Sequence, residues 1–347
     1  MKAAVLDFRF SDGHVKLNTN YILAMSRFCE MVVMNDGSYY NHIRNHSNIK
    51  LRDIEVPAKK KVNPLTFRLE CIKRMKGNIR QLKQEENVDC IIIFTYEIIT
   101  FALWPLLYRT NKPVYIFEHN SLDELTGVIK NICYNSYKNK VGHIVLEDIF
   151  TDFLIREKKV RKENVKVVHY CLDQVYENRP HKGRLKNIVC ISRCGDDQWI
   201  EDIIKEEESN KLFCNNKIKL LLRSGTINYT DGYLTVIKHY LTDDEYNNYV
   251  READAILMLG SHFKNRISCS IYDAITYGKV IIGIDIPIIR YLEDMTPTVV
   301  RHFSDMQDMV SIFLNEEFDV SEEEIHMLQS KYTSGMIVED WKKVLIG

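Results

Sequence analysis

The sequence predicts an α/β protein built from two doubly wound domains. Strand-like apolar segments alternate with helical segments along the whole chain, which is the pattern of parallel sheets with helices on both faces. The length of 347 residues allows two domains at about 150 residues each. A polar stretch over residues 173–186, with Pro180 and Gly183, separates two such series and is typical of a linker.

The first series, over residues 1–172, contains candidate strands and three candidate helices. Asn63 followed by Pro64 predicts the start of the longest helix, because Asn caps helices and Pro is favoured in the first turn. The candidate strands are Ala3–Phe8, Met31–Met34, Asp53–Pro57, Cys90–Phe94, Val114–Phe117, His143–Leu146 and Val165–His169. The candidate helices are Leu17–Phe28, Pro64–Lys83 and Thr100–Tyr108.

The second series occupies residues 187–320, and the final segment 321–347 is expected to be helical, with Trp341 and Leu345 as apolar anchors. The candidate strands are Asn187–Ile191, Lys217–Leu222, Tyr233–Ile237, Ala255–Leu259 and Val280–Gly283. Open parallel sheets bind ligands beyond the carboxyl ends of their strands. Two facing domains of this kind therefore predict a ligand site in a shared cleft.

Composition places the chain among ordinary globular proteins, at 45% hydrophobic and 27% charged residues. The nine cysteines are scattered, with no Cys-x-x-Cys pair, which argues against a disulfide framework and a structural zinc site. The short apolar run after Met1 is broken by Asp7 and lacks the length of a signal-peptide core. Glu97 and Pro105 interrupt the one stretch of near-transmembrane length. We therefore expect a cytoplasmic protein.

The two halves differ in charge. Residues 1–175 hold 27 Lys and Arg against 20 Asp and Glu, whereas the remainder holds 20 against 28. The basic clusters are Lys59–Lys61, Lys73–Lys76 and Arg156–Lys162. A solvated surface explains such runs, and so does attraction to an anionic membrane surface or a lipid-phosphate substrate. Nucleic acid is not expected as a partner, because no binding motif accompanies the charge.

The most informative window runs from residue 259 to 282. It contains a strand end, a polar loop, a helix over about Ile271–Tyr277, a stop at Gly278 and another strand. A loop of small polar residues that enters a helix offers backbone N–H groups and a positive dipole end to an anion. The alternative is an ordinary strand–helix–strand unit with a polar connection.

This window resembles the donor domain of the retaining GT-B glycosyltransferases of the large family four group. Those proteins carry Pro-Ser-x-x-Glu-Gly-Phe-Gly, then Glu-Ala-x-x-x-Gly-x-Pro-Val-Ile. The matching residues here keep the family's spacing, and Asn265 and Asp273 stand where the family has two glutamates. The matches are Gly260-Ser261, Asn265, Asp273-Ala274 and Gly278-Lys279-Val280-Ile281.

The resemblance implies specific roles for this loop. The second acid of the family holds the ribose hydroxyls, and Asp273 can accept the same hydrogen bonds. The first acid, with the loop backbone, holds the donor sugar, and Asn265 replaces it without negative charge. The implied donor-binding set also contains Ser261, Arg266, Ile267, Ser268, Cys269 and Ser270.

Other parts of the second half fit the same pattern. Asn187–Arg193 resembles the family's strand that ends in Gly-Arg, so Arg193 is implied as a catalytic diphosphate ligand. The lysine that normally follows is missing from residues 194–199. A leaving diphosphate needs positive charge, so we expect Arg223, at a strand end, to substitute. An exposed strand-end arginine without a ligand is the alternative.

The first half resembles the family more faintly. Lys112–Asn120 resembles the family's strand that ends in a histidine near the donor sugar, so His119 is a candidate catalytic residue. A histidine that only caps a helix is the alternative. Asp12, Gly13 and His14 lie in a loop that opens a helix, and we expect them on the acceptor side.

Together these features predict a metal-independent, retaining GT-B glycosyltransferase that uses no cofactor beyond its nucleotide-sugar donor. The acceptor would be a glycan or lipid-linked hydroxyl in surface polysaccharide or glycolipid synthesis, at the inner face of the membrane. The resemblance also implies that the C-terminal helix crosses back to the first domain. Because Asn265 and the missing lysine depart from the family, a catalytically inactive binding subunit is the alternative. A different GT-B enzyme that uses a sugar phosphate or an epimerase-type chemistry is a third.

Overall fold

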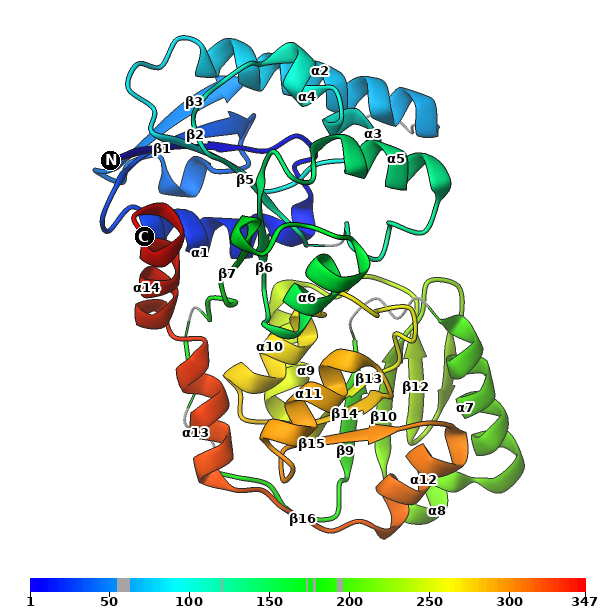
Figure 1. The fold of residues 1–347 in the computed structure, drawn as a ribbon. Helices are drawn as coiled ribbons and strands as arrows, with labels where there is room; N and C mark the ends of the chain where they lie inside the picture. Colours follow the sequence, from blue (N-terminus) through cyan, green and yellow to red (C-terminus); the bar gives the residue numbers. More distant parts are fainter. Residues whose placement is uncertain (55–62, 120, 173, 177–178, 192–195) are drawn as a thin grey trace. The chain divides into compact units, whose positions relative to one another are not determined.

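The computed structural model in Figure 1 describes residues 1–54, 63–119, 121–172, 174–176, 179–191 and 196–347, and only the backbone of Asp12. The chain forms two compact units. Unit 1 comprises Met1–Asp173 and Tyr332–Gly347, and unit 2 comprises Gln174–Lys331. Each unit is described by itself.

Unit 1 is built on a parallel sheet of seven strands in the order β3-β2-β1-β4-β5-β6-β7. The strands are β1 Lys2–Leu6, β2 Glu30–Asp36, β3 Ile49–Ile54, β4 Cys90–Ile93, β5 Val114–Phe117, β6 Gly142–Val145 and β7 Val165–Val167. Residues 3–6 of β1 and all of β4 are buried, as expected for central strands covered on both faces. From β1 the chain adds strands toward one edge of the sheet, up to β3, and from β4 it adds them toward the other edge. The topological switch point therefore lies between β1 and β4.

Helices cover both faces of this sheet, with α1 on one face and α2 on the other (Figure 1). The helices of this part of the chain are α1 Val15–Met25, α2 Pro64–Leu82, α3 Ile98–Phe101, α4 Trp104–Leu107, α5 Val128–Tyr137 and α6 Ile149–Asp152. Asn63 caps α2 as expected, since its side chain accepts a hydrogen bond from the Thr66 N–H at 2.9 Å. The helix expected over Thr100–Tyr108 is instead two short helices, because Pro105 favours a new helix start at α4.

The C-terminal helix α14, Ser334–Leu345, packs against α1 of unit 1. Trp341 is fully buried against Tyr21, with ring centroids 5.7 Å apart. Asp340 binds His169 at 2.7 Å, and the Tyr115 hydroxyl donates to the Val344 carbonyl at 3.1 Å. These contacts join the last residues of the chain to its first domain.

Unit 2 contains a second seven-stranded sheet, in the order β11-β12-β10-β9-β13-β14-β15. The strands are β9 Asn187–Cys190, β10 Lys219–Arg223, β11 Tyr229–Asp231, β12 Leu234–Ile237, β13 Ala255–Met258, β14 Val280–Ile284 and β15 Val300–Phe303. All are parallel except the edge strand β11. The topological switch point of this sheet lies between β9 and β13.

Seven helices of the described chain belong to unit 2: α7 Asp197–Asn210, α8 Leu212–Asn216, α9 Asp243–Glu252, α10 Cys269–Thr276, α11 Pro287–Met295, α12 Met306–Asn315 and α13 Glu322–Lys331. The stretch that we interpreted as a linker includes β8, Lys182–Gly183, which pairs with β16, Phe318–Asp319. Helix α13 belongs to unit 2, whereas α14 belongs to unit 1.

Some strands differ from those that we expected. The third strand begins earlier than expected, since β3 covers Ile49–Ile54 and the expected range was Asp53–Pro57; residues 55–57 of that range lie outside the described residues. Strands β11 and β15 were not expected, since β15 contains the polar pair Arg301 and His302. No helix among the described residues is both long and apolar enough to cross a bilayer.

Candidate functional site

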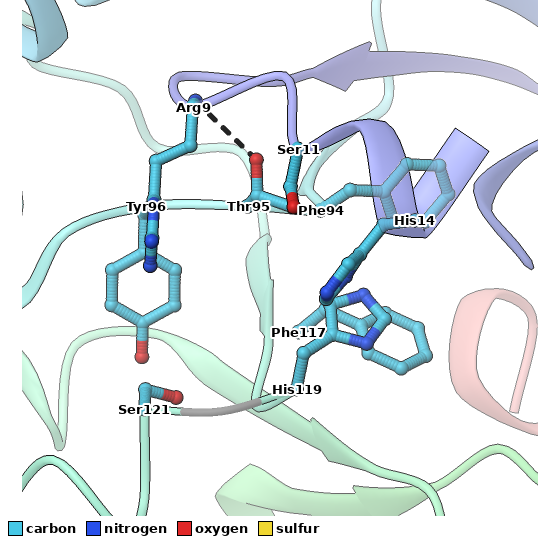
Figure 2. Close-up of a pocket in the computed structure, with 9 residues that line it drawn as sticks. All are labelled: Arg9, Ser11, His14, Phe94, Thr95, Tyr96, Phe117, His119 and Ser121. Atoms are coloured by element: carbon cyan, nitrogen blue, oxygen red, sulfur yellow. Dashed lines mark hydrogen bonds between the residues drawn. The ribbon is translucent and has the colours of Figure 1, made fainter. Parts of the chain in front are cut away.

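A small cavity of about 30 Å³ lies at the carboxyl edge of the sheet in unit 1. Its lining residues follow three neighbouring strands: Arg9, Ser11 and His14 after β1, Phe94, Thr95 and Tyr96 after β4, and Phe117, His119 and Ser121 at or after the end of β5. The cavity thus lies where the strand order reverses, which is the usual ligand position in open parallel sheets. Figure 2 shows Tyr96 and Ser121 on one side of it and the rings of His14 and His119 on the other.

The loop after β1 is held by the fully buried carboxylate of Asp7. This carboxylate accepts hydrogen bonds from the N–H of Arg9 at 3.0 Å, the N–H of Phe10 at 2.7 Å and the Thr95 hydroxyl. These contacts stabilise Phe10 in a left-handed conformation with φ 49°. Burial raises the pKa of Asp7 to about 6, although the hydrogen bond from Thr95 opposes the rise. The carboxylate is therefore mostly ionised at neutral pH.

A second buried carboxylate, Glu118, lies behind the other side of the cavity. One of its oxygens, Oε2, accepts from the Tyr96 hydroxyl at 2.7 Å and from the Ser121 hydroxyl. The other, Oε1, lies 2.6 Å from Nδ1 of His143, which is also fully buried. The cavity wall is therefore backed by an internal Glu–His pair, and Tyr96 and Ser121 are oriented by it.

The two histidines of the cavity stay neutral at physiological pH. Their ring centroids are 4.5 Å apart and the rings are nearly perpendicular. Burial, and then the nearby Arg9 charge, lowers the pKa of His14 to about 4. Burial, and then His14, holds the pKa of His119 well below its usual value. A neutral imidazole in a cavity can accept or donate a hydrogen bond, so His119 suits contact with a substrate hydroxyl.

In unit 2 the loops at the corresponding edge follow β9, β10 and β13. Ser261 donates to Asp196 at 3.0 Å and so joins the loop after β13 to the start of α7. Arg193 lies outside the described residues, so the structure leaves its role a prediction. Asn265 lies half-buried in the same loop, and Ile267 is buried.

Helix α10 begins where the resemblance places the donor-binding residues. Ser268 caps the helix, Cys269 is its exposed first residue, and Ser270 is buried in its first turn. Asp273 is half-buried one turn later and accepts a hydrogen bond from the Tyr246 hydroxyl at 2.7 Å. Burial, and then the Asp273 charge, raises the pKa of Tyr246 well above its usual value, so this hydroxyl stays a donor.

Two arginines of unit 2 lie over aromatic rings. The guanidinium carbon of Arg223, at the end of β10, is 3.8 Å from the centre of the exposed Tyr240 ring. Arg266 lies equally close to Phe263, at 3.8 Å. Arg223 is only 9% exposed, and among the described residues no carboxylate pairs with it and nothing bonds its Nε. A buried cation without a counter-charge is suited to bind an anion.

The structure brings together some of the expected residues. His14 and His119, which we assigned separately, line one cavity, whereas Gly13 is exposed beside it. The side chain of Asp12 lies outside the described atoms. The sequence analysis missed Thr95, which directly follows a predicted strand, and Ser121, which follows another after residues 118–120. It also missed Tyr240 and Tyr246, for which no local signal exists.

Among the described residues, no group of three or more His, Cys, Asp or Glu side chains could hold a metal ion. Metal independence itself stays a prediction.

Comparisons with known proteins concern the fold alone. No protein-family model and no curated protein sequence matches the chain. Among solved structures, sucrose-phosphate synthase from Thermosynechococcus elongatus is similar with a TM-score of 0.69 at 10% identity, over 99% of this chain and 97% of that one. HepE of Anabaena in complex with UDP has a TM-score of 0.65 at 12% identity and full coverage of both chains.

UDP-GlcNAc 2-epimerase from Methanocaldococcus jannaschii is also similar, with a TM-score of 0.60 at 11% identity over 100% of this chain and 99% of that one. Because a synthase and an epimerase share this architecture, the fold does not by itself select a reaction. The sequence prediction of the fold class is confirmed: the chain has an α/β GT-B fold with two Rossmann-like domains.

Proposed function

We propose that the protein is a glycosyltransferase that moves a sugar from a nucleotide diphosphate sugar to an acceptor hydroxyl. The observation that carries the proposal is Arg223, a buried guanidinium at the carboxyl end of β10 with no carboxylate partner among the described residues. The diphosphate of a donor would supply the missing negative charge. The complex of the similar HepE with UDP supports a nucleotide ligand.

The remaining donor contacts follow from α10. The backbone N–H groups of residues 267–270 lie at the positive end of this eight-residue helix and can bind phosphate oxygens. Asp273 would accept the ribose hydroxyls, with Tyr246 holding its carboxylate in place. In this proposal Arg193 and Arg223 stabilise the leaving diphosphate, and Asn265 contacts the sugar. His119 is the catalytic candidate of unit 1, where it contacts a substrate hydroxyl.

The finer expectations belong to the same proposal. Retention at the anomeric carbon, independence of metal, and a place in surface polysaccharide or glycolipid synthesis are implied by the family resemblance. Retention is tested by NMR of the anomeric proton of the first product formed. Metal independence is tested by activity after extensive treatment with EDTA.

A catalytically inactive binding subunit is the second candidate function, favoured by the neutral Asn265 at a position where the family has an acid. Both candidates bind nucleotide, so binding alone does not separate them. Prolonged incubation with donor does, because a transferase slowly transfers the sugar to water or acceptor and releases the nucleotide, whereas an inactive subunit releases none.

The first experiment is a thermal-shift panel of UDP, GDP, ADP, CMP and their common sugars with the wild type and Asp273→Ala. A ligand that binds the native state raises stability with the logarithm of its concentration over its dissociation constant. We expect one nucleotide series to stabilise the wild type and not the variant. If no nucleotide stabilises either protein, the donor assignment is wrong.

We further propose that the acceptor is presented at an anionic membrane, because unit 1 carries an apolar and basic surface. The exposed apolar residues of this surface lie on three packed elements, α2, α3–α4 and α5. They are Leu65 and Leu69, Leu103 and Leu106, and Val128, Ile129 and Ile132. Every exposed Leu, Ile or Val among the described residues belongs to this surface except Ile346.

Contacts tie the two outer helices together. Arg9 lies over the ring of Phe67 in α2, at 5.6 Å, and also pairs with Glu124 at 3.8 Å. Glu124 in turn pairs with Lys130 of α5 at 3.0 Å. The apolar side chains at the starts of α2 and α5 therefore flank one linked group of charges.

Charge favours an anionic bilayer as the occupant of this surface. Besides the buried Arg74, helices α2 and α5 carry five Arg and Lys residues and one acidic residue, Glu70. Clustered basic residues bind anionic lipid headgroups, and aliphatic side chains enter the interface. The basic cluster Lys59–Lys61 lies outside the described residues and is not used here.

Co-sedimentation with vesicles tests this surface. The full-length protein should bind vesicles that contain phosphatidylglycerol, and salt should weaken the binding. The double substitution Ile129→Ser and Ile132→Ser should reduce it about tenfold, whereas Met327→Ser, an exposed apolar control in unit 2, should not. Binding that is unchanged by the double substitution would contradict the assignment, and self-association lost with it would instead indicate a protein interface.

A further inference from the structure

Three hydroxyl groups of the unit 1 cavity share one feature: each donates its hydrogen bond to a buried carboxylate. Ser121 and Tyr96 both donate to Oε2 of Glu118, and Thr95 donates to Oδ1 of Asp7. A hydroxyl has one proton and two lone pairs. Each of these three oxygens therefore turns only lone pairs toward other partners.

The Glu118–His143 pair maintains this arrangement whichever partner holds the shared proton. Nε2 of His143 lies 2.7 Å from the Lys138 carbonyl, so it must carry a proton and donate. The contact between Nδ1 and Oε1, at 2.6 Å, then holds one proton, on either the nitrogen or the oxygen. In both cases Oε2 of Glu118 remains an acceptor, and it accepts the hydrogen bonds of the Ser121 and Tyr96 hydroxyls.

Asp7 does the same on the opposite side. Its Oδ1 also accepts two backbone N–H groups, so this oxygen acts as an acceptor toward Thr95. Thr95 Oγ1 accepts the Arg9 N–H at 3.3 Å (Figure 2), which leaves it one lone pair. Both walls of the cavity are therefore lined by acceptors.

The other groups of the cavity do not reverse this polarity. His119 Nε2 is buried and has no hydrogen-bond partner among the described residues. Arg9 is the cation among the lining residues, and it pairs with Glu124. The residual exposure of Ser121 and His119, 8% each, leaves an opening to solvent. A cavity of about 30 Å³ holds a group of the size of a water molecule.

We propose that this cavity binds a single substrate hydroxyl, which enters as a hydrogen-bond donor to Ser121, with Tyr96, Thr95 and His119 as its neighbours. Glu118 and Asp7 act as positioning residues, since each acts through the hydroxyl that it orients. The ligand class is a neutral polyol such as a sugar, and phosphate is disfavoured because its charged oxygens would face the lone pairs of these acceptors. The assignment of this ligand as part of a glycosyl donor or acceptor rests on the proposed function, whereas the polarity does not.

Histidine NMR of the full-length protein tests the proposal without knowledge of the natural substrate. The protein is labelled at the histidine ring nitrogens and titrated with glucose as a neutral hydroxyl probe and, separately, with inorganic phosphate. Signals are assigned from His119→Gln and His14→Gln. We expect glucose, and not phosphate, to shift the His119 signals saturably.

Variants separate the polarity from general packing. Ser121→Ala should weaken glucose binding about fivefold, the effect of one hydrogen bond, and Thr95→Val should weaken it by a smaller factor. Ser26→Ala is the matched control, since Ser26 is also buried in unit 1 and donates to a backbone carbonyl, at 2.8 Å. It should change nothing.

Glu118 offers a conservative rescue. In Glu118→Gln the amide oxygen can still accept from Ser121 and Tyr96 while the NH₂ group donates to Nδ1 of a neutral His143, so affinity should stay within about twofold. Glu118→Ala should weaken binding at least as much as Ser121→Ala. If Glu118→Ala does not fold, the Ser121 and Thr95 variants still decide.

Two results would overturn the proposal: saturable binding of phosphate at His119, or no response to glucose up to its solubility limit. Equal glucose affinity in Ser121→Ala and the wild type would also overturn it. A failure of nucleotide binding in the thermal-shift panel, with glucose binding intact, would instead remove the proposed function and leave the cavity assignment standing.

Discussion

The carboxyl edges of the two sheets use acidic and basic residues in opposite ways. In unit 1 the carboxylates of Asp7 and Glu118 are buried beneath the surface and serve the side chains above them. In unit 2 the carboxylate of Asp273 is half-buried and the cation Arg223 has no acidic partner among the described residues. At one edge the buried carboxylates are compensated by hydrogen bonds inside the protein, whereas at the other a buried cation has no acidic partner in the described part of the chain.

This difference teaches that ligand class follows from how charges are compensated, more than from which residues are present. Buried charges that are fully hydrogen-bonded inside the protein have nothing left to offer an ion, but they can orient hydroxyl groups. A buried cation that has no acidic partner in the protein can still form an ion pair with an anionic ligand. On this basis unit 1 suits a sugar hydroxyl and unit 2 suits a diphosphate.

The largest expected effect is a loss of stability in unit 1 when one of its buried carboxylates is removed. Asp7→Ala leaves several buried donors without an acceptor and should destabilise this unit by about 3 kcal/mol. In a Trp199→Phe background only Trp104 and Trp341 remain, both buried in unit 1, so fluorescence during urea denaturation reports on this unit. The control Asp273→Ala lies in unit 2, so its unfolding is followed by circular dichroism of the full chain. It should cost about 1 kcal/mol or less; equal losses would contradict the contrast between the edges.

The next effect concerns the uncompensated cation. Arg223→Ala should weaken nucleotide diphosphate binding by about 10- to 100-fold, the range for a charge-assisted contact, with unchanged affinity for the nucleoside. Isothermal titration calorimetry measures both. Arg184→Ala is the control, because Arg184 is exposed and pairs with Glu317 at 3.8 Å. Equal loss for nucleoside and diphosphate would show that Arg223 acts on folding rather than on phosphate.

A smaller effect is expected at the one carboxylate of unit 2 that we assign to a ligand. Tyr246→Phe removes the donor that holds Asp273 and should weaken nucleotide affinity about fivefold. Tyr249→Phe, on the same helix and more exposed, should leave affinity unchanged. Tighter binding in Tyr246→Phe would mean that the tyrosine competes with the ligand instead of orienting the carboxylate.

The smallest effect is a pH dependence confined to unit 1. The pKa of His14 falls from 6.5 to about 4 on folding, so its contribution to stability is lost as pH drops from about 6.5 toward 4. The pKa of Asp7 rises from 3.8 to about 6, so its contribution grows as pH falls below 6. The two effects oppose each other, and His14→Gln removes one of them.

We therefore expect His14→Gln to gain stability relative to the wild type between pH 7 and pH 6, by no more than about 1 kcal/mol. Melting temperatures across this range measure the difference. Parallel curves for the two proteins would contradict the neutral state that we assign to His14.

Much of the fold could be predicted because its signals are local. The run Val114–Phe117 is a strand and Pro64 begins a helix, as expected, since β-branched runs and helix caps act over a few residues. Gly278 ends the α10 region in a left-handed conformation, with φ 58°, that glycine adopts without strain. The strand β15 could not be found this way, because Arg301 and His302 obscure its pattern.

The sequence by itself determined the two α/β series, the charge difference between the halves and the candidate residues His119, Arg223 and Asp273. Only the tertiary structure decided which side chains surround these residues and how deeply they are buried. Strand order places His14 beside His119 and Thr95 beside Asp7, and it brings His143 to Glu118. Burial and the direction of a shared proton depend on these long-range contacts, which no local pattern of residues encodes.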